Sequence, residues 1–231
     1  MITHPPKYPS TPHWPWSQKV HRDDSYHEEP EFFLGKRVVI TEKLDGGNTC
    51  LWNGNVYARS TTLPAGDGWF AMVKKHHAWK THSTPWMALY GEDLYGIHSI
   101  EYGPVHEDQT YRMFASRHFD ETYDRFMDWD ETFNDSEIFD LPLVPIRFTG
   151  TFYEVDAITK WFEKELQKPS ELGGPCEGFV MRTWDGFDAV DFRRHVCKYV
   201  RANHVQTDEH WTKNWKPCPI LERGEQVYGK K

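Results

Sequence analysis

The pattern of apolar and polar positions is most regular over residues 37–60, where it predicts three strands joined by two turns. The first strand contains the β-branched run Val38-Val39-Ile40, which is typical of a buried strand. The dipeptide Asn53-Gly54 lies between two further apolar runs and is a strong signal for a two-residue hairpin. That hairpin would return Arg59 toward the end of the sheet where Lys43 leaves the first strand.

The rest of the chain alternates between strand and helix patterns. Apolar runs predict strands at 86–90, 111–115, 143–148, 177–182 and 193–200. Helical spacing predicts helices over 67–80, around 129–139 within the acidic segment 118–140, and over 155–166, before Pro169. No internal repeat stands out, so we expect one α+β domain over residues 37–231, with antiparallel sheets and flanking helices.

Residues 1–36 differ from the rest because prolines are dense and aromatic side chains lie between them. Proline blocks regular helix and sheet, yet Tyr8, Trp14 and Trp16 favour burial. We therefore expect an N-terminal arm that packs on the domain. Disorder is the alternative, and the tryptophans argue against it.

Composition narrows the class of protein. Aromatic residues make up 16% of the chain, which excludes a disordered polymer, and no apolar run approaches the ~18 residues of a membrane span. The N-terminus has no apolar signal core, and the four cysteines form no Cys-x-x-Cys, so we expect a cytoplasmic protein with reduced thiols. The formal net charge of -8 argues against a general nucleic-acid coat protein but permits a local basic groove.

Candidate chemistry begins at the end of the first predicted strand, in Thr41-Glu42-Lys43-Leu44-Asp45-Gly46-Gly47-Asn48. A lysine at the mouth of a buried strand can have its pKa lowered by desolvation and neighbouring cations, which would make Lys43 a nitrogen nucleophile. Gly46 and Gly47 would allow a sharp turn and the close approach of a ligand. The alternative is an ordinary hairpin with a solvated lysine.

Three further segments, which follow the Lys43 segment in the order of a known motif series, favour the interpretation of Lys43 as a nucleophile. Glu92 lies in Leu89-Tyr90-Gly91-Glu92-Asp93, Glu177 begins Glu177-Gly178-Phe179-Val180-Met181-Arg182, and Lys198 lies in His195-Val196-Cys197-Lys198-Tyr199. With the Lys43 segment they resemble the motifs of the covalent nucleotidyltransferase superfamily of polynucleotide ligases and capping enzymes, and are most similar to its RNA ligase branch. The resemblance covers residues 38 to about 200 and implies an ATP-grasp-like ligase adenylation domain.

The resemblance implies ATP with Mg²⁺ or Mn²⁺ as cofactors, an AMP carried covalently on Lys43, and nucleic acid ends or nicks, with RNA favoured, as partners. The AMP would pass to a 5′-phosphate end, which a 3′-hydroxyl then seals. Lys43 and Lys198 would be catalytic, and Glu177 would bind the metal. The nucleotide-binding residues implied are Glu42, Asp45, Gly46, Arg59, Glu92, Phe114, Glu177 and Lys198.

Two departures from the family pattern leave questions open. The final motif often reads Lys-x-Lys, but Val196 occupies the position of its first lysine. Either Lys198 acts alone, or Arg194 or Arg201 supplies the positive charge of the missing lysine. The 33 residues after Lys198 are too few for the OB-fold domain that many relatives carry there, so we expect no such domain. A partner protein could replace it. We expect the chain itself to be a monomer. The alternatives are a compact ATP-dependent DNA ligase, a capping guanylyltransferase, and an inactive nucleotide- or RNA-binding module.

Overall fold

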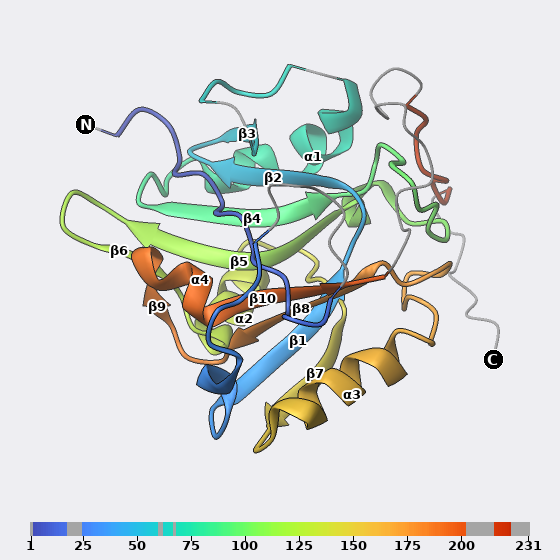
Figure 1. The fold of residues 1–231 in the computed structure, drawn as a ribbon. Coiled ribbons are helices and arrows are strands. Elements are labelled where there is room, and N and C mark those ends of the chain that lie inside the picture. Colours follow the sequence, from blue (N-terminus) through green and yellow to red (C-terminus); the bar gives the residue numbers. More distant parts are fainter. Residues whose placement is uncertain (1, 18–24, 60–61, 67, 202–214, 223–231) are drawn as a thin grey trace.

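Two antiparallel sheets form the framework of the computed structural model, which describes residues 2–17, 25–59, 62–66, 68–201 and 215–222 (Figure 1). Sheet A has the strand order β10 (Val196–Val200), β8 (Gly178–Thr183), β1 (Arg37–Lys43), β7 (Ile146–Thr151). Sheet B has the order β3 (Asn55–Ala58), β2 (Gly47–Trp52), β4 (Met87–Asp93), β5 (Tyr111–Phe119), β6 (Asp124–Phe126), β9 (Phe187–Asp188). The α+β class with antiparallel sheets is confirmed.

Helices lie around these sheets and are mostly short. They are α1 (Ala71–His76), α2 (Trp129–Ile138), α3 (Val155–Glu165) and α4 (Phe192–His195). Single 3-10 turns occur at Pro30–Phe33, Gly68–Phe70, Ala78–Thr81, Glu107–Gln109 and Ala189–Asp191. No helix in the described part of the chain combines the length and apolar character that crossing a bilayer requires.

Side-chain alternation along β1 determines what each face of sheet A contacts. Val38 and Ile40 point to the outer face, where they form a buried cluster with Trp14 of the arm and with Ile158 and Phe162 of α3. Because these apolar side chains are fully buried, each contributes on the order of 1.5–3 kcal/mol to folding. The alternate positions of β1 therefore face inward.

The inner faces of the two sheets share a second apolar cluster. It joins Tyr90 of β4 and Phe126 of β6 to Val196 of β10, with Val180 of β8 packed against it. A third cluster, including Val73 of α1, covers the outer face of sheet B. The two sheets are thus stacked, with the inner layer apolar at one end.

The chain passes from one sheet to the other directly after Lys43. Strand β1 pairs only with β7 and β8, whereas β2 pairs with β3 and β4. The ordinary-hairpin alternative for this segment is therefore wrong. The hairpin predicted at Asn53-Gly54 is confirmed between β2 and β3, with φ of 47° and 79° at its two central residues.

Several predicted boundaries differ from the structure. Residues 193–195 belong to α4, so the last strand begins only at Val196, because Phe192 turns inward to join the inter-sheet cluster. The strand predicted at 143–148 is β7, shifted to Ile146–Thr151. The helix predicted over 67–80 is broken near His77, and the segment 118–140 contributes β6 before α2 begins at the capping box of Asp128 and Glu131.

Candidate functional site

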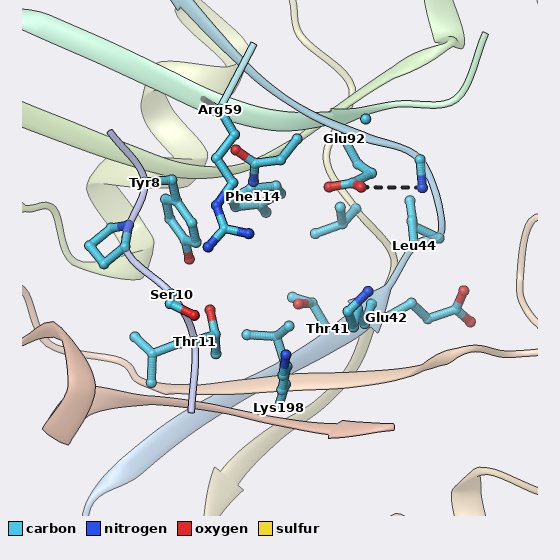
Figure 2. A pocket seen from close by; sticks show the side chains of 18 of the residues that line it. Tyr8, Ser10, Thr11, Thr41, Glu42, Leu44, Arg59, Glu92, Phe114 and Lys198 are labelled. Atoms are coloured by element: carbon cyan, nitrogen blue, oxygen red, sulfur yellow. Dashed lines mark hydrogen bonds between the residues drawn. The ribbon is translucent and has the colours of Figure 1, made fainter. Parts of the chain in front are cut away.

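A cavity of about 740 Å³ lies between the two sheets and is lined by both of them and by the N-terminal arm (Figure 2). That volume falls in the range of small-molecule sites, ~300–1,000 Å³. The register of sheet A places Thr41, Val180 and Lys198 side by side across β1, β8 and β10, and all three line the cavity. The inward face of sheet A therefore forms its floor.

Lys43 lies where β1 ends, and its Nζ donates a hydrogen bond of 2.6 Å to Oε1 of Glu177. Glu177 comes immediately before β8, and its neighbour Gly178 pairs with Lys43. Burial alone would lower the pKa of Lys43, but the charges of Glu177, Glu92 and Asp45 outweigh it and raise the pKa. The expectation of a lowered pKa is thus wrong, because acids rather than cations surround the amine.

Glu92 approaches the same amine from β4 in sheet B. Its Oε1 accepts a hydrogen bond of 3.2 Å from the backbone of Gly46. Burial, with the charges of Glu177 and Asp45, raises the pKa of Glu92 to about 8 despite the opposing effect of Lys43. Burial likewise raises the pKa of Glu177, against the effect of Lys43. The site thus holds more buried acidic groups than its lysine can balance.

Asp45 uses its side chain to fasten a neighbouring loop. Its Oδ2 accepts hydrogen bonds of 2.7 Å from the backbone N–H of Ser99, the hydroxyl of Ser99 and the backbone N–H of Ile100. The backbone N–H of Asp45 donates to the hydroxyl of Tyr102 at 2.8 Å. These bonds hold in place the loop that brings His98 to the cavity wall.

The carboxylate of Glu42 points away from the cavity, as strand alternation requires for the residue between Thr41 and Lys43 (Figure 2). It is almost fully buried, is ion-paired with Arg147, and accepts a hydrogen bond of 2.6 Å from Ser170. Only its backbone is left to face the cavity. The predicted role of Glu42 in nucleotide binding therefore cannot involve the carboxylate in this arrangement.

Gly46 is required by a close approach rather than by the turn itself. It has no positive φ, but a Cβ there would lie 2.5 Å from the backbone oxygen of Asp93. At Gly47 the same atom would lie 3.8 Å away, an ordinary contact. The predicted turn is formed, and its steric constraint falls on the first glycine alone.

Arg59 and Phe114 reach the cavity from sheet B. Arg59 directly follows β3, and its backbone N–H donates to the oxygen of Asn48 at 3.1 Å, which confirms that the hairpin returns it toward the Lys43 end. Phe114 lies on β5 and faces the floor formed by sheet A (Figure 2). The cavity thus has an aromatic ring on one sheet opposite Val180 on the other.

Neither of the two arginines suggested as substitutes for the missing lysine lies in the cavity wall. Arg194 pairs with Glu29 and stacks on Phe32, and Arg201 donates to the backbone oxygen of Leu166. Arg182, which lines the cavity, is instead the register partner of Val196 on β8. Burial lowers its pKa to about 10, which leaves the guanidinium charged at neutral pH.

Sequence reasoning missed several lining residues. Strand alternation is a signal that could have found Thr41, which lies two residues before Lys43 and faces the same way. It could also have found Arg182, which lies two residues after Val180, the register partner of Lys198. The N-terminal segment Tyr8–Thr11 and His98 also line the cavity. They are brought there by contacts distant in sequence, for which the local pattern carries no signal.

A divalent cation would not find a complete protein cage here. Within the described ranges, no group of three or more histidine, cysteine, aspartate or glutamate side chains is arranged to hold a metal ion. Mg²⁺ commonly binds through one or two carboxylates with water and substrate phosphates. The buried carboxyls of Glu177 and Glu92, with their raised pKa values, fit that partial kind of site.

Comparisons with known proteins agree with this geometry. The family model for RNA ligase matches residues 36–200. No curated protein matches the chain.

Solved structures of low sequence identity share the fold. A protein of Aquifex aeolicus assigned as an ATP-dependent DNA ligase has a TM-score of 0.51 at 16% identity, covering 84% of this chain and 49% of its own. A Naegleria gruberi RNA ligase variant solved with ATP and Mn has a TM-score of 0.53 at 14% identity, covering 88% of this chain and 62% of its own. The chain thus spans about half the length of the first and about three fifths of the second.

Proposed function

Because the chain belongs to the RNA ligase family, we propose that it is an ATP-dependent RNA ligase that acts through a lysyl-AMP intermediate. The observation that carries the proposal is the ammonium of Lys43, held 2.6 Å from the buried carboxylate of Glu177 at a cavity between two sheets. Lys198 lies in the floor of that cavity and Phe114 in its opposite wall. A nucleophile and a second cation serve the transfer of a nucleotidyl group, and an aromatic ring can stack on a base.

In the first step the Nζ of Lys43 attacks the α-phosphorus of ATP. A nitrogen–phosphorus bond forms, the bond to the β-phosphate oxygen breaks, and pyrophosphate leaves. Lys43 must lose a proton for this, although the acids around it raise its pKa. Glu177 accepts a hydrogen bond of 2.6 Å from Nζ and orients the amine for the attack, and the proton passes to solvent.

In the later steps the AMP moves from Lys43 to a 5′-phosphate end, and the nitrogen–phosphorus bond breaks. A 3′-hydroxyl then attacks that end, a phosphodiester forms, and AMP is released. Lys198 and Arg182, both in the floor of the cavity, are the cations proposed to stabilise charge on the α-phosphate. Arg182 thereby supplies the charge that Val196 cannot.

Mg²⁺ or Mn²⁺ would be held by Glu177, with Glu92 nearby, and would supply positive charge beside the phosphates. Removing negative charge from around Lys43 in this way also favours the neutral amine. The remaining roles are those that the family resemblance implies for residues that line the cavity. Glu92 would face the sugar hydroxyls, Arg59 would contact a phosphate, and Phe114 would stack on the base.

We place the enzyme in the cytoplasm as a monomer, with RNA as the favoured substrate. A compact ATP-dependent DNA ligase is the second candidate, and the DNA ligase assignment of the Aquifex aeolicus protein keeps it in view. Sealing assays with nicked RNA, nicked DNA and hybrid duplexes separate the two. If sealing needs an added protein, we infer that this partner supplies contacts to the nucleic acid ends, which this domain cannot make by itself.

The deciding experiment is incubation with Mg²⁺ and α-labelled ATP, followed by denaturing electrophoresis and intact mass. The protein should first be stripped of bound AMP with pyrophosphate. We expect a covalent AMP adduct that is absent in Lys43→Ala and retained in Lys36→Ala, a lysine outside the cavity. An adduct that survives Lys43→Ala contradicts the assignment of the nucleophile. No adduct in the wild-type protein favours a nucleotide-binding module, and a GMP adduct favours a guanylyltransferase.

A further inference from the structure

The N-terminal arm crosses from one sheet to the other (Figure 1), and its residues Tyr8–Thr11 line the cavity. On sheet B, the backbone oxygen of Pro6 accepts a hydrogen bond of 2.6 Å from the hydroxyl of Tyr90, and that of Lys7 accepts one of 3.3 Å from Arg117. Toward sheet A, the indole N–H of Trp14 donates to the hydroxyl of Thr159 on α3 at 2.9 Å. The arm is therefore fastened to both layers.

Between these anchors the arm runs parallel to β10 and binds the backbone of Lys198 on both sides. The N–H of Lys198 donates to the oxygen of Pro12 at 2.8 Å, and its C=O accepts from the N–H of Trp14 at 2.7 Å. Trp14 itself is fully buried. The position of Lys198 on its strand edge thus depends on the arm.

The part of the arm that spans the gap, Tyr8–Thr11, is a wall of the cavity (Figure 2). Tyr8, Ser10 and Thr11 lie on the side away from Glu92 and Leu44. The Tyr8 ring is 5.0 Å from that of Phe114, edge to face, and 5.1 Å from that of Phe192. This wall lies outside residues 36–200, the part of the chain that matches the family model.

We propose that this wall contacts the nucleoside part of the bound nucleotide, so that Tyr8, Ser10 and Thr11 determine nucleotide affinity. The proposal rests on the proposed function. The phosphates have cations available at Lys43, Lys198 and Arg59, whereas the arm offers neutral hydroxyls, which both donate and accept hydrogen bonds. Neutral hydroxyls suit a sugar or the edge of a base. The ring contact of Tyr8 with Phe114 places the Tyr8 side chain beside the aromatic ring proposed to stack on the base.

The test compares binding of AMP and of pyrophosphate to the full-length protein by calorimetry. Thr11→Val and Tyr8→Phe each remove one hydroxyl with little change of shape. We expect both to weaken AMP binding at least threefold while pyrophosphate binding stays within twofold. In lysine adenylylation, the KM for ATP should rise more than kcat falls.

Matched controls are Thr3→Val, an exposed residue of the same arm, and Tyr153→Phe, which is 78% exposed. Neither should change AMP binding, and melting temperatures should show that all four variants fold. Wild-type AMP affinity in Thr11→Val and Tyr8→Phe overturns this proposal, and an equal loss of pyrophosphate binding overturns the assignment to the nucleoside. A wild-type protein that binds no nucleotide and forms no adduct overturns the proposed function and this proposal with it.

Discussion

Lys43 and Glu177 are joined by an ion pair whose two partners are exposed very differently, with 29% of the lysine side chain accessible but only 2% of the glutamate. The pairing follows from the register, because Lys43 lies opposite the glycine that comes directly after Glu177. The buried carboxyl of Glu177 therefore holds an amine whose side chain is still accessible to a substrate.

This relationship predicts how readily the Lys43 amine reacts with an acylating reagent in the absence of nucleotide and metal. Glu177→Gln removes a charge that raises the pKa of Lys43. At pH 8 the neutral fraction of the amine should therefore rise, by at least about threefold, since one pKa unit corresponds to tenfold. Peptide mass spectrometry after brief acetylation measures this. Glu137→Gln, an exposed residue of α2, is the control, and equal labelling in both variants contradicts the ion pair.

The two glycines after Asp45 should differ in tolerance. Gly46→Ala would place a methyl group 2.5 Å from the Asp93 backbone oxygen and 2.9 Å from Leu94, so the free energy of unfolding should fall by about 2 kcal/mol or more. Gly47→Ala meets only ordinary contacts and should cost less than about 1 kcal/mol. Urea unfolding of the two variants checks the difference. Equal stabilities of Gly46→Ala and Gly47→Ala would mean that the backbone near Asp93 moves to admit the methyl group at little energetic cost, which contradicts the prediction.

Arg147 should be important for stability although it lies outside the cavity wall. Its side chain is 6% exposed and pairs with the buried carboxylates of Glu42 and Glu165. Arg147→Met leaves the buried charge of Glu42 without its cation, whereas Glu165 keeps its pair with Lys168. The change should cost about 3–5 kcal/mol, measured by denaturant unfolding. Adding Glu42→Leu should recover part of the loss. Lys75→Met, which breaks an exposed pair with Glu107, should leave stability nearly unchanged.

Asp93 should give the protein a pH-dependent stability. It is 3% exposed, and within the described residues its Oδ2 has no hydrogen-bond partner; burial raises its pKa to about 7. Between the ordinary aspartate pKa and 7 the folded state binds more protons than the unfolded state, so stability falls as pH rises. Asp93→Asn should raise the free energy of unfolding by ~4 kcal/mol at pH 8.5 and by about half of that at pH 5.5. Thermal melts at both pH values test this, with exposed Glu137→Gln as control.

Restoring the family lysine should not improve the enzyme. Val196 is 2% exposed and packs in the inter-sheet cluster with Phe187 and Phe192. Val196→Lys would bury an ammonium beside Arg182, and stability should fall by more than about 2 kcal/mol. The rate of adduct formation, measured with labelled ATP on the folded fraction, should not exceed that of the wild type. A faster rate at unchanged stability would show that the missing lysine limits activity.

The sequence predicted the local elements of the site well, because their signals are local. The β-branched run before Lys43, the Asn53-Gly54 hairpin and the strand after Glu177 each occur as expected. The direction of the Glu42 side chain was also available from strand alternation, although the resemblance alone assigned it to the nucleotide.

What the sequence could not provide depends on distant contacts. The raised pKa of Lys43 requires three acids from three different segments, and the role of Asp45 depends on Ser99 and Ile100 in a loop with no regular pattern. The start of β10 was misjudged because Phe192 is buried between the sheets, which favours a helical turn where β-branched and basic residues resemble a strand. Tertiary packing decided these points.

The arm also has a consequence for the order of events during synthesis. The residues of the arm are synthesised before those of β10, yet the backbone N–H of Val200 donates to the hydroxyl of Ser17, 183 residues away in sequence. Contacts of such separation form late in folding, because a long loop must close before they are made. The wall of the cavity therefore cannot be completed before β10 has been synthesised. Under the proposed function, a nascent chain that lacks β10 binds no nucleotide.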